Sequence, residues 1–418
     1  MNKSYRIHLT SLALTKTADG LIDPKLVLAW LLNAIGSPGY LVGMLVPVRE
    51  SGALLPQLLL ARVIQRREIR KYFWAGGAAL QGLAALGMAV AALTLPGAVA
   101  GWVILLLLAV LAIARSACSA SYKDVLSRTV EKGNRGKVSG TAGTVAAVAV
   151  LVFALLLSTG ILPREPLFVS AAIAVAGGLW LLAAGVFSRL EEPEDNSASD
   201  ADVSLSGLLN PLQEDSEFRN YIATRALLIS TALAPPFLVM LGSTDTGFGN
   251  LGLLVLASSI ASIVSSYLWG ALSDWSSRQS LMLAGAISGV VLAIASATGF
   301  LDLIDEAGLL IAVYVFVSQI AYQGVRAARK THLTDMDSHG QKSIYTALSN
   351  TLIGVLLVLG GLFGALADLA GPETVLAVLA ALSLAAIVAA SRLSEVQRDA
   401  GSEDDAQTST NTDGSQQT

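Results

Sequence analysis

Acidic and basic residues stand close together in the first fifty residues of this chain, among neighbours that are mostly apolar. Lys16 and Asp19 are three positions apart and Asp19 and Asp23 four apart, so a helix would carry them on one face. Arg49 and Glu50 stand side by side in the stretch LVPVRESGALLPQ. Charges inside an apolar span cost at least about 2.5–3.5 kcal/mol each, so they usually face the interior and pair. A carboxylate in such a network can take up and release a proton.

Two later stretches carry polar groups that could contact a solute. Arg225 lies in the apolar sequence TRALLIS. The side chains at four-residue spacing in a later stretch would form a polar aromatic stripe on a helix. They are Tyr314, Ser318, Tyr322 and Arg326, with Gln319 and Gln323 beside them. Such a stripe could line a cavity and bind a polar solute. Hydrogen bonding between neighbouring helices is the alternative explanation.

The composition indicates where these groups must lie. Of the 418 residues, 54% are hydrophobic and 14% charged, and the mean hydropathy is +0.64. A soluble globular protein normally carries about 25% charged residues. Apolar stretches recur near the roughly 20 residues that cross about 30 Å of hydrocarbon. The sequence therefore predicts an all-α integral membrane protein.

An internal repeat divides the chain into two halves. Moving residues 1–190 forward by 207 to 209 positions brings Lys123-x-x-Leu126 onto Lys330-x-x-Leu333, and three other regions match at nearly the same offset. We expect one six-helix bundle over 1–190 and a second over 217–393. The acidic segment 191–216 is predicted to be a cytoplasmic linker, and 394–418 a disordered cytoplasmic tail. Two repeated halves are the architecture of many secondary transporters.

The repeat also gives a register for the first two helices. Hydropathy alone places the first helix over 26–46, with Arg49 and Glu50 in an outer loop over 48–51. The offset from the second half instead predicts helices over 7–32 and 40–63, joined by a turn over 33–39. Arg49 and Glu50 would then lie about 15 Å deep, near the midplane. An amphipathic surface helix over 1–20, with solvated charges, is the alternative for the first charges.

Ten further spans complete the expected topology. They cover 72–95, 102–121, 138–162, 167–187, 218–241, 250–272, 281–301, 308–326, 344–369 and 372–391, which makes twelve transmembrane helices in two pseudo-symmetric bundles. Basic residues gather in the loops after the even-numbered spans. Because basic loops stay in the cytoplasm, both termini are predicted to be cytoplasmic in a multi-pass protein of the inner (plasma) membrane.

One loop carries a motif that links the chain to a known family. The stretch LWGALSDWSSRQS has Gly270, Asp274 and Arg278 at four-residue spacing, and its first-half counterpart ARVIQRREIR retains Arg66 and Arg70. This pattern resembles the cytoplasmic loop signature of the major facilitator superfamily. The resemblance implies that these five residues form a gate, in which a small residue lets two helices approach and a carboxylate pairs with a basic residue. A charged helix cap is the alternative.

The resemblance extends to an arginine in the fourth span. Arg115, in VLAIARSACSAS, resembles the superfamily's membrane-embedded arginine, which is associated with proton coupling; snorkelling to the interface is the alternative. The family implies a permease that moves a small solute by alternating access. The candidates for proton coupling are Glu50, Asp19, Asp23 and Arg115. The candidates for substrate binding are Arg49, Lys16, Arg225, Tyr314, Ser318, Gln319 and Tyr322.

Other classes of function find less support in the residues. There is no P-loop sequence, Cys118 is the only cysteine, and the three histidines show no ligand spacing. His332 and His339 fall in an expected cytoplasmic loop, so their side chains are predicted to be solvated. We expect no cofactor, no metal, no enzymatic activity and no nucleic acid partner. We expect a monomer in the lipid bilayer that binds a small solute and moves it together with protons, by symport. The buried cations favour a solute that is anionic or zwitterionic. The alternative is a membrane assembly or chaperone factor that retains the scaffold without transport.

Overall fold

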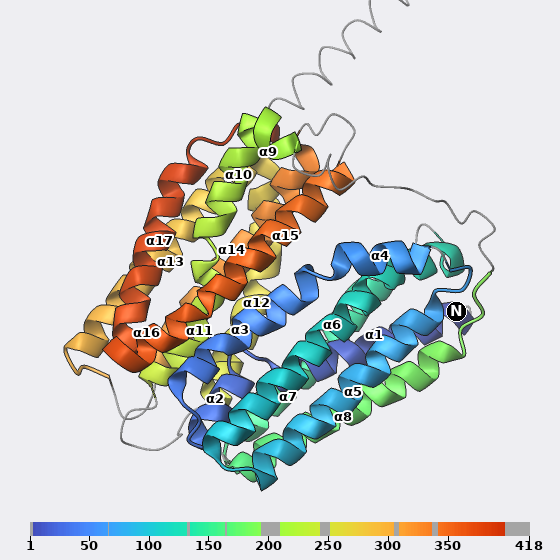
Figure 1. Cartoon of the computed structure of the whole chain (residues 1–418), viewed down its shortest axis with the longest axis horizontal. Helices are drawn as coiled ribbons and strands as arrows, with labels where there is room; N and C mark the ends of the chain where they lie inside the picture. Colours follow the sequence, from blue (N-terminus) through green and yellow to red (C-terminus); the bar gives the residue numbers. More distant parts are fainter. Residues whose placement is uncertain are drawn as a thin grey trace, which may run out of the picture.

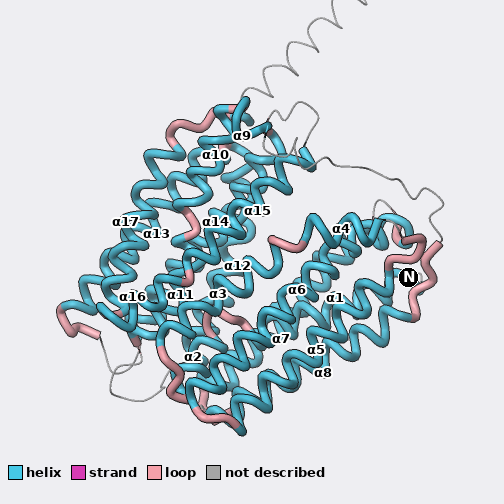
Figure 2. Tube along the Cα trace, in the orientation of Figure 1, coloured by secondary structure: helices cyan, strands magenta, loops and turns pink. Residues whose placement is uncertain are grey.

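The computed structural model describes residues 3–65, 67–131, 134–163, 165–193, 210–242, 251–304, 309–336 and 342–397, and every regular element in these ranges is a helix (Figures 1 and 2). The first half contains α1 (Lys3–Ile22), α2 (Val27–Ala34), α3 (Gly39–Leu54), α4 (Gln57–Gln65), α5 (Lys71–Thr94), α6 (Gly97–Thr129), α7 (Arg135–Ser158) and α8 (Pro166–Ser188). The second half contains α9 (Asn210–Glu214), α10 (Ser216–Leu227), α11 (Ser230–Leu241), α12 (Leu251–Trp275), α13 (Ser277–Phe300), α14 (Leu309–Asp335), α15 (Lys342–Gly360), α16 (Leu362–Ala370) and α17 (Pro372–Ala390).

Each predicted span coincides with one helix or with two consecutive helices. In the described part of the chain, nine helices are long and apolar enough to cross a membrane, or ten if α12, which bends by 43°, counts as one span. The spans predicted over 7–32 and 40–63 correspond to α1–α2 and α3–α4, which are broken and carry charges. The predicted turn over 33–39 separates α2 from α3. Arg49 and Glu50 therefore lie inside a helix, and the outer-loop alternative is wrong.

Local sequence explains where the helices break. Pro24 and Pro56 have no N–H to donate, and they lie in the turns between α1 and α2 and between α3 and α4. At the first break, the Asp23 carbonyl accepts from the backbone N–H groups of Val27 and Leu28 at 2.9 and 3.1 Å, which satisfies donors at the start of α2. Pro235 and Pro236 lie within α11, and the break comes one to two turns earlier, between α10 and α11.

Helices of each half pack mainly on one another. In the first half α5 packs on α6 and α8, and α1 on α7 and α8; in the second half α13 packs on α14 and α17, and α12 on α14. Since α1 is packed inside the first bundle, with Ala18, Leu21 and Ile22 buried, the surface-helix alternative for residues 1–20 is wrong. Figure 1 shows the two groups of helices inclined to each other.

The halves meet most closely at one end of the molecule. We call the end that holds Lys3, Arg70 and Arg278 the basic end, and the other the opposite end. At the opposite end, α2 and α3 contact α11, and α3 contacts α16; α4 and the start of α15 diverge toward the basic end (Figure 1). A Cβ on Gly364 of α16 would lie 2.7 Å from the carbonyl oxygen of Tyr40 in α3, so only glycine allows this approach.

Candidate substrate cavity and charge cluster

One carboxylate joins three helices of the first half. Asp19 of α1 accepts a hydrogen bond from Nη2 of Arg49 (α3) at 3.3 Å. It also forms a close ion pair with Nη1 of Arg115 (α6). The side chains of Asp19, Arg49 and Arg115 are 22%, 12% and 37% exposed. We call these three residues the Asp19 cluster. The cluster is therefore only partly buried.

Glu50, next to Arg49, has a different environment. Among the residues that the structure describes, it forms no ion pair within 4 Å, although Lys25 and Arg329 are close enough to interact with its charge. Lys25 itself extends from the break between α1 and α2 to the second half, where its Nζ lies 3.2 Å from the centroid of the Tyr322 ring. This cation–π contact links the two halves beside the Asp19 cluster.

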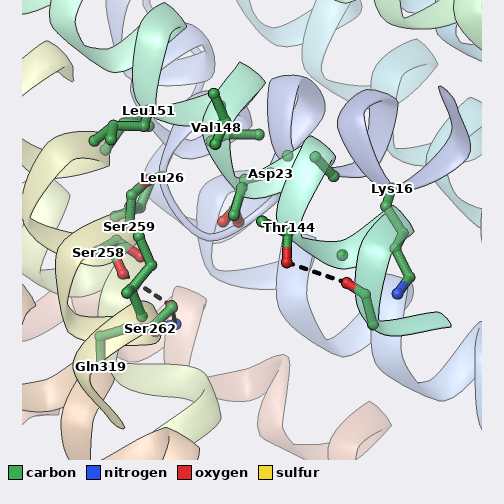
Figure 3. A pocket seen from close by; sticks show the side chains of 18 of the residues that line it. Lys16, Asp23, Leu26, Thr144, Val148, Leu151, Ser258, Ser259, Ser262 and Gln319 are labelled. Carbon is green, nitrogen blue, oxygen red and sulfur yellow. Dashed lines mark hydrogen bonds between the residues drawn. The ribbon is translucent and has the colours of Figure 1, made fainter. Parts of the chain in front are cut away.

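A cavity of about 830 Å³ lies between the halves (Figure 3). Its walls come from α1 and α7 on one side and from α12 and α14 on the other. Figure 3 shows Ser258, Ser259 and Ser262 of α12 close to Gln319 of α14, with Asp23 and Lys16 across from them. The volume lies within the range of about 300–1,000 Å³ that is typical of small-molecule sites.

Three of the expected site residues line this cavity. Lys16 Nζ donates to the carbonyl oxygen of Ser139 in α7 at 2.9 Å. Asp23 lines it as well, but its Oδ1 accepts the backbone N–H of Lys25 at 2.8 Å and so also stabilises the break after α1. Gln319 Nε2 donates to the hydroxyl of Ser262 at 3.0 Å.

The remaining substrate-binding candidates lie elsewhere. Arg225 is buried and donates to Ser349 and Asn350 of α15. Tyr314 and Ser318 are also buried, and the Tyr314 hydroxyl donates to Thr298 of α13 at 3.2 Å. The helical stripe therefore divides: Tyr314 bonds to a neighbouring helix, whereas Gln319 and Arg326 line the cavity.

Solved structures share the fold of this protein over almost the whole chain. A mutant form of the nucleoside transporter NupG matches with a TM-score of 0.72 and 13% identity, covering 93% of this chain and 99% of that one. A POT family transporter in complex with a thioalcohol-conjugated peptide matches with a TM-score of 0.68 and 9% identity, covering 92% and 94%. The chain has the major facilitator fold. These matches are transporters rather than enzymes, and the predicted resemblance is confirmed at the level of the fold. No family model and no curated protein matches the sequence.

Only some of the described residues of the predicted loop motif, which would form a gate, contact a partner in the structure. Nothing lies within 4 Å of a Cβ built on Gly270, so the expected close approach of two helices at this glycine is not observed. Asp274 is exposed at the basic end, where the halves diverge, and forms no ion pair within the described ranges. Arg278 pairs with Glu395 at 2.8 Å, and Arg70 with Asp124 at 2.7 Å. Arg66 lies outside the described residues.

In each half, a glutamate in the segment after the last helix binds back to the helices of that half. The sequence interpretation missed this feature. In the first half, Glu192 accepts the backbone N–H groups of Arg70 and Lys71 at 3.0 and 2.7 Å. In the second half, Glu395 holds Arg278 and also accepts from Ser276 at 2.6 Å. Each glutamate follows the last helix of its half, which is the only signal that could have found them. The first residues of the predicted linker and tail are thus bound.

The prediction of a solvated side chain is wrong for His332. His332 of α14 is fully buried, with Nδ1 2.9 Å from the Ser277 hydroxyl and Nε2 3.2 Å from Glu217 of α10. His8 of α1 is fully buried too and contacts Thr129 at 2.7 Å. The His332 ring stacks on Tyr221, and the His8 ring contacts Tyr122 and Phe187, so helix packing buries both histidines. His339 lies outside the described residues.

Proposed function

We propose that this protein is a secondary transporter that moves a small anionic or zwitterionic solute by alternating access, coupled to protons. The observation that carries the proposal is the Asp19 cluster, in which one carboxylate holds two arginines beside a cavity between the halves. Charges that cost free energy to place in an apolar span usually mark a solute or proton pathway.

The proposed topology follows the repeat. Twelve spans, with α1–α2 and α3–α4 as the first two, form bundles over 1–190 and 217–393, joined by a linker over 191–216 and followed by a tail over 394–418. Both termini would be cytoplasmic, in the inner membrane, and the protein would act as a monomer. The basic end is then the inner side, so this conformation is closed outside, at α3 and α16, and diverges inside.

Proton coupling would use the carboxylates of this region. A proton on Glu50 or Asp19 removes a negative charge that holds nearby cations, so those cations become available to a solute anion. Release of the proton restores the internal pairing and expels the anion. Asp23 would take part less directly, because it also caps the break after α1. Closure at the basic end would involve the loop residues Gly270, Asp274, Arg278, Arg66 and Arg70.

Proteoliposomes provide the test. Purified protein is reconstituted with a pH-sensitive dye inside the vesicles, and organic anions, amino acids and neutral sugars are added outside with an imposed proton gradient. The wild type should take up a solute together with protons, and Glu50→Gln should abolish the proton movement. Glu131→Gln, at an exposed position, is the matched control and should transport normally. Absence of uptake and of proton movement with every solute would favour the assembly-factor alternative.

A further inference from the structure

Two cations from opposite halves, Lys16 and Arg326, line the same cavity. Lys16 belongs to α1 and Arg326 to α14; both line the cavity, and their charges interact. Within the described residues neither forms an ion pair within 4 Å. Lys16 Nζ donates to the carbonyl oxygen of Ser139, and Arg326 is exposed and lines the cavity. Like charges repel each other, and the repulsion is unfavourable unless an anion is present.

The wider surroundings also have too few acids. The carboxylates of Asp19, Asp23 and Glu50 are outnumbered by six cations that interact with them, Lys16, Lys25, Arg49, Arg115, Arg326 and Arg329. Six positive groups against three negative ones leave a formal excess of three positive charges. Asp19 is engaged by two arginines, and Asp23 by a backbone N–H of its own turn. Glu50 interacts with Lys25, Arg49, Arg326 and Arg329 together, so in the described part of the chain the acids do not balance the charges of Lys16 and Arg326.

We propose that an anionic group of the solute, a carboxylate or a phosphate, binds between Lys16 and Arg326 and draws the two halves together. This inference rests on the proposed function and specifies its substrate class. The empty cation pair favours divergence at the basic end, because the two charges belong to different halves. A bound anion replaces that repulsion by two attractions and favours closure. Guanidinium groups bind carboxylates and phosphates with strong charge-assisted hydrogen bonds.

The opposite wall of the cavity indicates the rest of the solute. Ser258, Ser259 and Ser262 stand on α12 next to Gln319, which uses its Nε2 to bind Ser262. The carbonyl oxygen of Gln319 has no donor among the described residues, so it can accept from a hydroxyl or an amine. The remaining lining is largely apolar. A small anion that carries hydroxyl groups fits this combination of walls.

Equilibrium binding tests the cation pair directly. Full-length protein in detergent is titrated by calorimetry with gluconate, glucose 6-phosphate and sorbitol, which are a carboxylate, a phosphate and a neutral polyol. At least one anion should bind, and sorbitol should not. Arg326→Gln and Lys16→Gln should each weaken anion binding by about tenfold or more. Arg326→Lys, which retains the charge, should retain most of the affinity, and Lys330→Gln, an exposed cation on α14, is the control that should bind normally.

Distance measurements test the closure. Spin labels at positions 137 of α7 and 271 of α12, both exposed, are introduced into a Cys118→Ser background. The anion that binds should shorten the distance between the labels in the wild type and leave it unchanged in Arg326→Gln. A distance that does not respond to a bound anion would contradict the closing role.

The outcomes separate this inference from the proposed function. Three results would overturn the cation pair as the anion site. They are equal binding of sorbitol and both anions, no binding of either anion, and an unchanged affinity for the anion in Arg326→Gln. Anion binding that depends on Arg326 without uptake in vesicles would overturn transport and leave the site standing. Uptake by Arg326→Gln at the wild-type rate would overturn the site alone.

Discussion

Removing the charge of Asp19 should destabilise the first half more than removing any exposed acid. The substitution Asp19→Asn leaves Arg49 and Arg115 facing each other without a counter-charge. At 3.3 Å, the attraction between Asp19 and Arg49 is about 5 kcal/mol for an effective dielectric constant of about 20. Hydration offsets most of this value, and a hydrogen bond to a charged group contributes about 1.5–3 kcal/mol net.

The exposure of Arg49 and of Arg115 determines how much stability Asp19→Asn should lose. Arg49 is 12% exposed and should contribute fully, whereas Arg115 is 37% exposed and its share must be reduced for solvent screening. We expect Asp19→Asn to lower the free energy of unfolding by about 2–4 kcal/mol. Chemical denaturation of the purified protein in detergent measures this loss. Glu191→Gln is the control, because Glu191 and Lys3 form an ion pair that is exposed on both sides, and no measurable change is expected.

A double substitution tests the physical cause. If the loss arises from uncompensated guanidinium charge, then Arg115→Gln should recover part of it when added to Asp19→Asn, with a coupling of about 1 kcal/mol or more. Strict additivity of the two changes would refute the ion-pair explanation. So would a stability of Asp19→Asn equal to that of the wild type.

Two further predictions concern the ends of the molecule. Gly364→Val should separate α16 from α3, because its Cβ would meet the Tyr40 carbonyl oxygen at 2.7 Å, and should lower the free energy of unfolding by about 1–3 kcal/mol in the same denaturation assay. Gly178→Val, where the Cβ meets open space, is the control and should lower it far less. Equal losses of stability in the two variants would contradict the close contact. Glu217→Gln should weaken the attachment of the chain that follows α17, since Glu217 accepts hydrogen bonds from the backbone N–H and the hydroxyl of Ser394, both at 2.9 Å. The C-terminal segment of the variant should be proteolysed faster. An unchanged rate of proteolysis would show that these hydrogen bonds do not hold the segment in place.

The positions of the helices could be predicted from the sequence, including the least obvious pair. Apolar length and turn residues determine where a chain in lipid can satisfy its own backbone hydrogen bonds, and both are local properties. The internal repeat added the register of 7–32 and 40–63, which hydropathy alone misplaced. It thereby put Arg49 and Glu50 inside α3.

The partners of the charged groups could not be predicted in the same way. Helical spacing put Lys16 and Asp19 on one face, yet Asp19 pairs with Arg49 and Arg115, which are 30 and 96 positions away, and Lys16 bonds to the backbone of α7. Likewise, spacing alone did not show that His332 would be buried against Glu217. Such choices depend on the angles at which helices cross and on the reach of side chains between them. Local pattern thus determined which groups enter the interior, and only the packing of the helices decided which of them meet.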